Sequence, residues 1–463
     1  MKEFDVVVIG SGPGGYTTAI RASQLGFKTA IIERDRLGGV CLNWGCIPTK
    51  ALLKNAELMN GVKHLDNYGI SVDNVKFDFE KIIARSRGVA DTSEKGVKYL
   101  MKKNKIEVFE GSGFINKDKS ITVSDKDGKE TEKIISKHTI IATGAKARSL
   151  GNLKFDEKKV LSSTGAMILK ELPKKMTIVG SGAIGVEFAY FYNAFGTEVT
   201  IIEMMPNIMP IEDKDISDVV AREFKKSGIK ILTDTKTESV EVKGGVVTTK
   251  VSGKTTEDIV SDVVLIAIGV TGNVENLGLE ELGIKVEKSS IVVDKDYKTN
   301  VEGIYAIGDV NGPPWLAHVA SSEGINCIEK IKGMHTPDID YNTIPGCTYC
   351  QPQVASVGLT EKKAIEEGYE VIVGKFPFSA NGKSRAIGET AGMVKVIFDK
   401  KYDELIGAHI VGAEATELIM EFVLAKSLEA THEQIIKTVH AHPTLTESNL
   451  EAVGVAYGEA INI

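Results

Sequence analysis

The sequence contains one structural plan twice, and this repeat restricts the possible folds more than any other feature. Residues 5–35 (DVVVIGSGPGGYTTAIRASQLGFKTAIIERD) are typical of a buried strand, a glycine turn, a helix and a second strand that ends in an acid. Residues 176–206 (MTIVGSGAIGVEFAYFYNAFGTEVTIIEMMP) repeat this order, with the glycines and the acid 170 residues further along the chain. Two such units predict an α/β protein with two dinucleotide-binding domains.

The glycines of each unit have separate tasks. In the first unit Gly10 makes the tight turn, Gly12 lets the backbone approach a pyrophosphate, and Gly15 lets the helix pack against the strand. Glu33 is placed to accept hydrogen bonds from a ribose. The corresponding positions of the second unit are Gly180, Gly182, Gly185 and Glu203. One glycine motif is weak evidence, because such turns also occur where nothing binds, but two correctly placed copies predict two nucleotide sites. The acid at Glu203 favours NAD over NADP, because a carboxylate repels a 2′-phosphate.

The rest of the chain is arranged around these units. One strand leaves the first unit at Thr143-Gly144, and its counterpart, residues 263–273, ends the second. Residues 299–310 (TNVEGIYAIGDV) are predicted to return to the first domain, with Asp309 either as a cofactor contact or as a strand-end turn or helix cap. We expect a first nucleotide domain, a second one, a segment that completes the first, and a third domain, at 1–145, 146–270, 271–341 and 342–463.

Two further segments have a clear pattern. Residues 77–105 have apolar side chains at helical spacing, and their lysines are expected to form a solvated face. The third domain contains two strand-like runs and a helical run, at 353–360, 392–400 and 416–430, and it lacks a GxGxxG motif. Its apolar content fits either a packed domain or a subunit interface.

Composition sets the class of protein. A chain of 463 residues suggests about three domains at one per ~150 residues. The net charge of -7 argues against a nucleic-acid partner. The sequence has no apolar run long enough to cross a bilayer, and it starts on a strand without a signal peptide, so we expect a cytoplasmic protein with no membrane partner. Disulfides in the cytosol are seldom structural and are usually catalytic or redox-sensing.

A close cysteine pair stands out against that background. Residues 38–50 (GGVCLNWGCIPTK) contain Cys41 and Cys46. An ideal helix would place their Cα atoms roughly 8.7 Å apart, beyond the usual disulfide range of about 4.4 to 6.8 Å. A bond therefore requires a distorted turn, for which Gly45 and Pro48 supply the means.

The alternative for this pair is two reduced, half-buried cysteines. Their position favours a redox role, because Cys41 follows Glu33 by only 8 residues and a redox cofactor's ring could lie beside it. A strained, accessible disulfide is easily reduced. The thiolate of Cys46 would be favoured if it lies near a helix start or a cation such as Lys50.

Read in order, these segments resemble the flavin-dependent pyridine nucleotide-disulfide oxidoreductases. The resemblance spans nearly the whole chain and rests on two glycine fingerprints, the CxxxxC segment, ATG at 142–144, residues 299–309, LAHVASSEG at 316–324 and HPTLTE at 442–447. The carboxyl-terminal HAHPTLTE is similar to the branch of that family that oxidises dihydrolipoamide.

The resemblance implies a fold and two cofactors. The fold is α/β, with two Rossmann-like dinucleotide-binding domains plus a C-terminal α+β interface (dimerisation) domain. The residues implied to hold FAD are Gly10, Gly12, Gly15, Glu33, Lys50, Thr143, Gly144, Asp309 and Ala317. Those implied to hold NAD are Gly180, Gly182, Gly185, Glu203 and Gly269. Lys50 and Glu187 would form an ion pair beside the flavin.

The resemblance also implies catalytic roles. Cys41 would exchange with the substrate, and Cys46 would face the flavin. His442 would be the base, since a histidine near its pKa can take a proton from a thiol, and Glu447 would orient it. A core residue is the alternative for a single histidine and a metal site for His440 with His442, but neither explains the accompanying Pro443 and Glu447, so we expect no metal site and a structural His440. In the family His442 reaches the disulfide of the other subunit, which implies a homodimer joined by the third domains.

The expected reaction is oxidation of dihydrolipoamide by NAD+, through the cysteine pair and FAD. The lipoyl group would be carried by a partner, a lipoylated protein of a 2-oxo acid dehydrogenase complex or a glycine cleavage system. Two alternatives are a related reductase of glutathione disulfide or mercuric ion, and a non-catalytic flavoprotein subunit. Glu203 argues against an NADPH-linked reductase, the ending YGEAINI lacks the cysteine pair of a mercuric reductase, and no cysteine or histidine of the site is lost.

Three features depart from the family pattern. Cys347 and Cys350 form CTYC, for which zinc or a second redox pair is conceivable; residues three apart in a strand point to opposite faces, so two buried thiols are expected. Cys327 is expected in a helix core. Trp44, between the redox cysteines, is bulky and is expected to narrow the approach to the disulfide.

Overall fold

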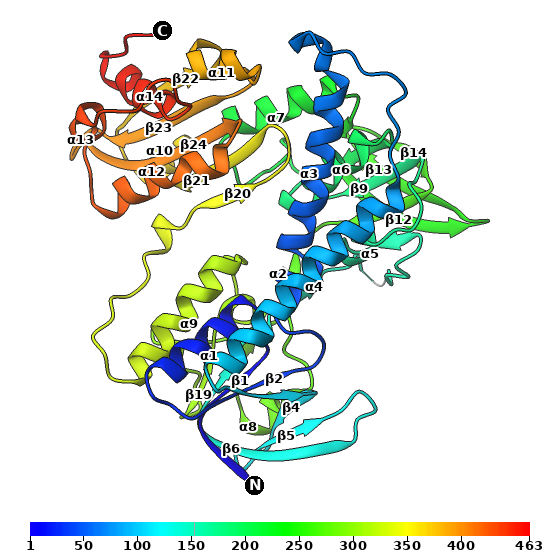
Figure 1. The fold of residues 1–463 in the computed structure, drawn as a ribbon, viewed down its shortest axis with the longest axis vertical. Helices are drawn as coiled ribbons and strands as arrows, with labels where there is room; N and C mark the ends of the chain where they lie inside the picture. The colour runs from blue at the N-terminus through cyan, green and yellow to red at the C-terminus, as the bar shows by residue number, and fades with distance from the viewer. Residues whose placement is uncertain (152) are drawn as a thin grey trace. The chain divides into compact units, whose positions relative to one another are not determined.

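The computed structural model describes residues 1–151 and 153–463 (Figure 1). The chain forms two compact units, each built from three segments. The first contains Met1–Ala51, Glu80–Arg148 and Gly269–Ile339, and the second contains Leu52–Phe79, Ser149–Ile268 and Asp340–Ile463. The mixed α/β class predicted from the sequence is confirmed. The finer four-part division stays a prediction.

The first unit is built on a seven-stranded sheet. Its central strand, β1 (Lys2–Ile9), lies between β2 (Thr29–Glu33) and β6 (Glu130–Ile141) and is parallel to both. The apolar run from Val6 to Ile9 is fully buried, as expected for a parallel strand covered on both faces. The other strands are β3 (Glu107–Glu110), β4 (Ser112–Ile115), β5 (Ile121–Ser124) and β19 (Ile304–Ala306), which pairs with β6.

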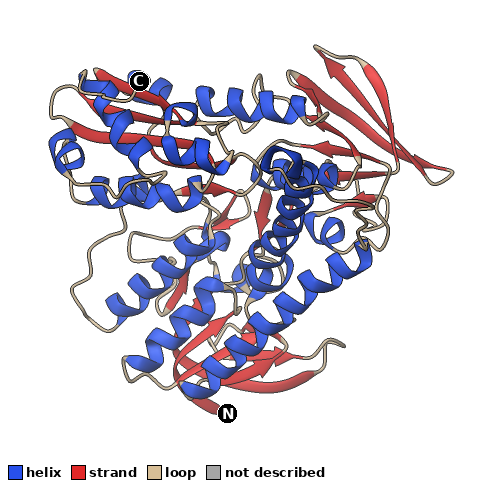
Figure 2. Cartoon of the chain, turned by 45° about the horizontal axis from the view of Figure 1, so that its top comes forward, coloured by secondary structure: helices blue, strands red, loops and turns tan. Residues whose placement is uncertain are grey.

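Helices α1 (Pro13–Gln24) and α9 (Ala317–Ile331) lie side by side next to this sheet (Figure 1). Figure 2 shows strands of the sheet behind helices near the N-terminus. The two helices are in close contact, because a Cβ at Gly324 would lie 2.0 Å from Thr18 Oγ1. The remaining elements in or entering this unit are α2 (Gly39–Trp44), α3 (Cys46–Lys63), α4 (Phe79–Lys103), β7 (Ala145–Ala147), β16 (Val270–Gly272), α8 (Leu279–Leu282), β17 (Val286–Glu287), β18 (Ser290–Ile291) and the short 3-10 helix η2 (Gly308–Asn311). The helix predicted over 77–105 is confirmed as α4.

The second unit repeats the strand, glycine turn and helix order. Its parallel sheet has the order β11-β10-β9-β15-β8, and α6 follows β9 directly. The elements are β8 (Val160–Leu161), α5 (Ser163–Met167), β9 (Lys175–Val179), α6 (Ala183–Ala194), β10 (Glu198–Ile202), α7 (Lys214–Lys226), β11 (Lys230–Leu232) and β15 (Val263–Ile266). A three-stranded antiparallel sheet accompanies them, with β12 (Thr235–Lys243), β13 (Val246–Gly253) and β14 (Glu257–Ser261).

The carboxyl-terminal part of this unit is a five-stranded antiparallel sheet of order β20-β21-β24-β23-β22. The strands are β20 (Gly346–Thr348), β21 (Gln353–Gly358), β22 (Val371–Pro377), β23 (Met393–Asp399) and β24 (Glu404–Gly412). The helices are α10 (Glu361–Glu366), α11 (Gly382–Ile387), α12 (Ala415–Ser427), α13 (His432–Lys437) and α14 (Glu447–Tyr457), and the short 3-10 helices of this unit are η1 (Leu65–Tyr68), η3 (Tyr341–Thr343) and η4 (Phe378–Ala380). One face of the sheet packs on α12 and α14. The strand and helix runs predicted here are confirmed.

A buried lysine connects the other face of this sheet to α7. Lys395 of β23 has a side chain that is 2% exposed, and its Nζ lies 2.8 Å from Asp213 Oδ1. It also lies 2.7 Å from Asp215 Oδ2 and 2.7 Å from Glu361 Oε2. Burial alone would lower the pKa of Lys395, but the hydrogen bonds to these carboxylates outweigh it and raise that pKa. The lysine therefore stays charged and compensates three acids.

We expect Lys395→Met to lower the free energy of unfolding by about 3 kcal/mol, because it leaves partly buried carboxylates without their cation. Urea unfolding at neutral pH measures this change. Lys375→Met is the matched control: Lys375 Nζ lies 2.7 Å from Asp215 Oδ2, but its side chain is 45% exposed. Its loss should cost less than about 1 kcal/mol. Equal effects of the two substitutions would contradict the assignment of the stabilisation to the buried charge.

Candidate active site

The first glycine turn joins β1 to α1. Gly10 has φ +101°, and a Cβ there would lie 2.3 Å from Ala142 O. A Cβ at Gly15 would lie 1.9 Å from Gly10 O. At Gly12, the N-cap of α1, a Cβ would meet no described protein atom within 4 Å. The protein itself thus requires the first and third glycines, whereas the second leaves open space before a helix N-terminus, which suits a phosphate.

The second glycine turn has the same geometry. A Cβ at Gly180 would lie 2.3 Å from Ala267 O, and one at Gly185 would lie 2.1 Å from Gly180 O. Gly182, the N-cap of α6, again has nothing described within 4 Å of its Cβ position. The two copies are therefore equivalent in their packing as well as in their sequence.

A serine ties each acid to its glycine turn. Ser11 donates to Glu33 Oε2 from its amide at 2.9 Å and from its hydroxyl at 2.6 Å. Ser181 donates to Glu203 Oε2 in the same way, at 3.0 Å and 2.6 Å. Neither serine was predicted from the sequence, although both copies read GSG. Each carboxylate is thereby fixed at the end of its strand, beside the turn.

Other predicted cofactor residues gather in the first unit. Thr143 donates from its hydroxyl to Asn273 O at 2.8 Å, and Asn273 Nδ2 donates to Thr143 O at 2.9 Å. Gly144, the residue after Thr143, has a φ of +68°. Gly269, with φ +103°, accepts a bond from Arg148 N and belongs to the first unit, although it was predicted with the NAD residues. Its predicted contact with NAD stays a prediction.

Asp309 lies in η2, close to the start of α9 at Ala317. Burial, and then the charge of Glu323, raise the pKa of Asp309 to about 6. Glu323, which sequence reasoning missed, accepts bonds from Gly308 N at 2.6 Å and Asn311 Nδ2 at 3.2 Å and so shapes this turn. A half-buried carboxyl of this kind suits hydroxyl donors of a bound nucleotide.

The cysteine pair lies at a break between two helices. Helix α2 ends at Trp44, Gly45 has φ -146° and ψ -117°, and α3 begins at Cys46. The distorted turn that a disulfide would require is thus present at Gly45, and Cys46 lies at a helix start. A hydrogen bond with Cys46, and then burial, raise the pKa of the Cys41 thiol, while the Lys50 ammonium acts in the opposite direction. The start of α3 is a favourable place for negative charge on Cys46.

This segment lies against the first glycine turn. Gly38 N donates to Ser11 O at 3.0 Å, and a Cβ at Gly39 would lie 2.6 Å from the Gly12 Cα. The cysteine segment therefore lies beside the first glycine turn, which we call the first nucleotide cradle. This is the position expected for a thiol pair that exchanges electrons with a ring held there.

The predicted acid and histidine pair is in contact. His442 Nδ1 lies 2.9 Å from Glu447 Oε1, and Glu447 Oε2 accepts from Thr444 N at 2.8 Å. Burial alone would raise the pKa of Glu447, but the hydrogen bonds from Thr444 and His442 outweigh burial and lower that pKa. The His442 side chain is 78% exposed. Since a carboxylate only accepts, Nδ1 donates this bond, and Nε2 is the ring nitrogen not engaged by Glu447.

His440 has a different environment. Its side chain is 6% exposed, Nε2 lies 2.7 Å from Glu421 Oε1, and Nδ1 lies 2.9 Å from Thr438 O. The hydrogen bond with Glu421 raises the pKa of His440. Glu421 in turn accepts from Asn449 Nδ2 at 2.8 Å. This network anchors the segment that carries His442, in agreement with a structural His440.

Two predicted contacts join residues of different units. Lys50 belongs to the first unit, and Glu187, which is 5% exposed on α6 and accepts from Tyr349 N at 3.0 Å, belongs to the second. Cys41 and His442 are divided in the same way. The Lys50 and Glu187 ion pair, and the approach of His442 to the cysteines, stay predictions.

The other cysteines partly follow the expectation. Cys327 is fully buried in α9, and Cys350 is buried with its Sγ 3.2 Å from Pro352 O. Cys347 was expected to be buried but is only half-buried in β20, because this strand lies at the edge of its sheet. Among the described residues, no group of three or more histidine, cysteine or acidic side chains could hold a metal ion.

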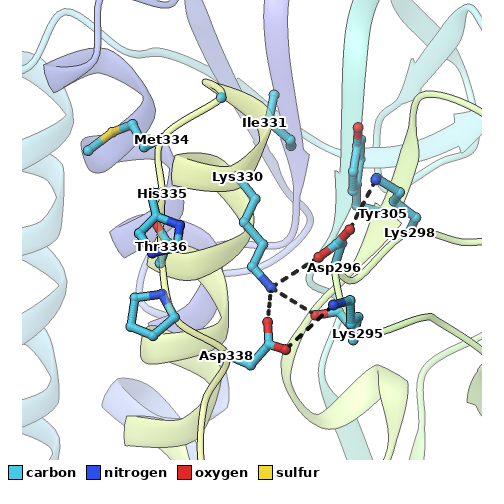
Figure 3. Close-up of a pocket in the computed structure, with 12 residues that line it drawn as sticks. Lys295, Asp296, Lys298, Tyr305, Lys330, Ile331, Met334, His335, Thr336 and Asp338 are labelled. Atoms are coloured by element: carbon cyan, nitrogen blue, oxygen red, sulfur yellow. Dashed lines mark hydrogen bonds and ion pairs between the residues drawn. The ribbon is translucent and has the colours of Figure 1, made fainter.

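A surface pocket of the first unit is lined by residues other than the predicted site residues (Figure 3). Lys330 Nζ in this pocket pairs with Asp338 at 2.5 Å and with Asp296 at 3.0 Å. Its charged side chains thus compensate one another, and nothing there suggests catalysis. Across the described part of the chain, no helix is both long and apolar enough to span a membrane.

The comparisons with known proteins identify the family of this chain. Residues 4–324 match the family described as pyridine nucleotide-disulphide oxidoreductase, and residues 344–453 match the dimerisation domain of that family. The chain belongs to the pyridine nucleotide-disulphide oxidoreductases. It is 48% identical over 482 residues to a dihydrolipoyl dehydrogenase of Rhizobium etli, covering 100% of this chain and 99% of that one. It is also 48% identical to one of Zymomonas mobilis, covering 99% of each.

Solved structures show the same fold. LpdA from Mycobacterium tuberculosis has a TM-score of 0.90 at 24% identity, covering 98% of this chain and 99% of that chain. The HOCl-induced flavoprotein disulfide reductase RclA from Escherichia coli has a TM-score of 0.86 at 28% identity, covering 97% and 99%. The predicted fold class is thus confirmed. The chain is an oxidoreductase that uses FAD and NAD, and the match to the dimerisation domain supports a homodimer.

Proposed function

We propose that this chain is a dihydrolipoamide dehydrogenase, which oxidises dihydrolipoamide to lipoamide and reduces NAD+ to NADH. The observation that carries the proposal is the break at Gly45, which brings Cys41 and Cys46 into hydrogen-bond contact directly after the first nucleotide cradle. The dihydrolipoyl dehydrogenases among its relatives support the choice of substrate.

The two cradles divide the cofactors between them. FAD would be held by the first glycine turn with Glu33, Lys50, Thr143, Gly144, Asp309 and Ala317. NAD would be held by the second turn with Glu203 and Gly269. When bound, FAD supplies the conversion between thiol and hydride chemistry that no side chain can perform. The protein's own contribution is to hold and exchange the thiols and to move their protons.

The thiol exchange uses the cysteine pair in its oxidised form. A thiolate of dihydrolipoamide attacks the Cys41 sulfur, the bond from Cys41 to Cys46 breaks, and Cys46 leaves as a thiolate at the start of α3. The second substrate thiol, as its thiolate, then attacks the substrate sulfur bound to Cys41; this mixed disulfide breaks, Cys41 leaves as a thiolate, and lipoamide is released. Two electrons have passed from the substrate to the cysteines, and the two thiol protons must be removed.

His442 is the proposed acceptor of one of these protons. With Nδ1 bonded to Glu447, the Nε2 lone pair is available to deprotonate a substrate thiol. We place His442 of one subunit at the cysteine pair of the other, so that a single subunit has no complete site. Lys50 and Glu187 would form an ion pair beside the flavin.

The proposed partner is a lipoylated protein of a 2-oxo acid dehydrogenase complex or of a glycine cleavage system. Such a protein would present dihydrolipoamide on a mobile arm to the cysteine pair. The proposed location is the cytoplasm, where thiols are kept reduced and a cysteine pair is usually redox-active.

The test is NAD+ reduction by dihydrolipoamide with the purified, FAD-loaded protein. We expect rapid NADH formation, and much slower reduction of NADP+ because Glu203 repels the 2′-phosphate. A parallel assay supplies NADPH and glutathione disulfide. No turnover of dihydrolipoamide by protein with bound FAD and both cysteines intact would overturn the proposal, and turnover in the parallel assay would identify a reductase instead.

Alanine substitutions at Gly182 and Gly185 of the second turn should distinguish an effect on NAD binding from an effect on stability. Gly182→Ala adds a methyl group where no described protein atom lies within 4 Å, at a φ of -67° that alanine accepts. We expect unchanged stability and weaker NAD binding, seen as a rise in KM for NAD+ of about tenfold or more, because the methyl occupies the space of the pyrophosphate.

Gly185→Ala is the matched contrast. Its Cβ would lie 2.1 Å from the Gly180 carbonyl oxygen, so the helix and strand must separate. We expect a lower melting temperature for this variant. A Gly182→Ala protein that binds NAD normally would show that the second turn is not the NAD site.

A further inference from the structure

Helix α4 holds the two helices on either side of the cysteine break. Three consecutive side chains of α4 donate to backbone carbonyls of α2 and α3. Arg87 Nη1 lies 2.7 Å from Asn43 O in α2, close to its end. Ser86 Oγ lies 3.0 Å from Pro48 O, and Arg85 Nη1 lies 2.9 Å from Ala51 O, both in α3. The angle between α2 and α3 is therefore set from outside the CxxxxC segment.

Trp44 adds a second link between the break and α4. It is the last residue of α2, directly before Gly45. The Arg87 guanidinium carbon lies 4.9 Å from the centroid of its ring, in the range of a cation-π contact. The indole Nε1 donates to Asp35 Oδ2 at 3.1 Å. Arg87 thus satisfies a terminal carbonyl of α2 and packs on the last side chain of the same helix.

The stretch before the cysteines is fixed in the same way. Arg36 Nη2 lies 2.6 Å from Asp91 Oδ1, and Arg36 Nε lies 2.7 Å from Glu94 Oε2, both acids on α4. Asn43 is buried and donates from Nδ2 to Leu37 O at 3.0 Å. The contacts with α4 extend from residue 36 to residue 51 and so lie on both sides of the break at Gly45.

We propose that Trp44 and Arg87 are positioning residues that keep the chain broken at Gly45 and so keep Cys41 and Cys46 close enough to form a disulfide. The inference rests on the proposed function, in which these two cysteines are the redox pair. An uninterrupted helix would separate their Cα atoms by roughly 8.7 Å, which no disulfide of about 4.4 to 6.8 Å can bridge. Weakening the hold of α4 should allow α2 and α3 to straighten, which favours the dithiol over the disulfide.

The test is a redox titration of the FAD-loaded protein in mixtures of reduced and oxidised dithiothreitol. In this exchange the disulfide takes two electrons from the reagent, whose two thiols become a cyclic disulfide. Acid quenching, alkylation and mass spectrometry give the fraction of disulfide between Cys41 and Cys46. We expect Trp44→Val and Arg87→Gln each to shift the equilibrium about tenfold toward the dithiol, which corresponds to about 30 mV.

Arg21→Gln is the matched control. Arg21 Nη2 lies 2.5 Å from Glu329 Oε1, so this variant also removes a guanidinium that links two helices of the first unit, and the hydrogen bonds of Arg21 go to Glu329 and Gln24 rather than to the cysteine segment. It should titrate like the original protein. Arg87→Lys should show an intermediate shift, because an ammonium can donate to Asn43 O but cannot stack its plane on the indole.

The outcomes separate this inference from the proposed function. If the unaltered protein forms no disulfide between Cys41 and Cys46, the proposed function fails. If it does, and both variants titrate within twofold of it, or shift toward the disulfide, the inference is overturned. The amount of bound FAD and the melting temperature of each variant verify that the variant is folded. If Arg87→Gln does not fold, Trp44→Phe decides: it keeps an aromatic ring but loses the indole N–H, and it should shift the equilibrium in the same direction.

Discussion

Serine at either Cys41 or Cys46 is expected to lower NAD+ reduction by dihydrolipoamide by on the order of 10⁴-fold or more, the scale of loss when a nucleophile is removed from a catalytic set. A hydroxyl cannot form the disulfide that the substrate thiolate must break, so no electrons can enter by this route. The fold should persist, because Cys46 is half-buried at the first residue of α3, where serine is well tolerated. Steady-state NADH formation measures the loss.

Cys347→Ser is the control for this experiment. Cys347 is also half-buried, but it lies in β20, and it should retain activity. Turnover above a few per cent in either redox-cysteine variant, with FAD bound, would show that electrons reach the flavin by another path.

The substitution Glu447→Gln is expected to lower kcat about as much as loss of His442, by roughly 10² to 10⁴-fold, the usual contribution of a general base. Thr444 N requires an acceptor, so the carbonyl oxygen of the new side-chain amide should turn toward it and the amide NH₂ toward His442 Nδ1. The imidazole proton then moves to Nε2, and the nitrogen that should take a proton already carries one.

Two comparisons test this reasoning. His442→Gln should show the same loss of kcat, since no imidazole remains to accept the substrate proton. His335→Gln, a change at an exposed histidine of the first unit, should leave kcat unchanged. A Glu447→Gln enzyme with normal kcat would mean that Glu447 only supports the loop and that the tautomer of His442 is set elsewhere.

Features carried by short, local patterns could be predicted from the sequence. The glycine turns are of this kind, because Gly10 and Gly15 are required by backbone atoms a few residues away or on the neighbouring strand. The break at Gly45 was also predictable, since glycine and proline flank it and an intact helix would separate the cysteines.

Features that depend on strand register or on distant helices could not be predicted. Lys395 looks like an ordinary strand residue, and only the pairing of β23 with β24 and the packing of α7 bring acids to it. Residues 77–105 were recognised as a helix with a solvated face, but Arg87 lies 44 residues after Asn43, and no local pattern links the two. Trp44 was expected to narrow the approach to the disulfide. The structure shows instead what holds its ring, and the effect on substrate access stays a prediction.

The discontinuity of the first unit determines the order in which a nascent chain can fold. Strand β6 ends at Ile141, but its partner β19 begins only at Ile304, and α9, which packs on α1, ends at Ile331. The amino-terminal strand leaves the ribosome first, yet its sheet is closed only after most of the polypeptide has been made. Until then the end of β6 is an unpaired strand edge, the kind of surface that invites aggregation and engages chaperones during synthesis.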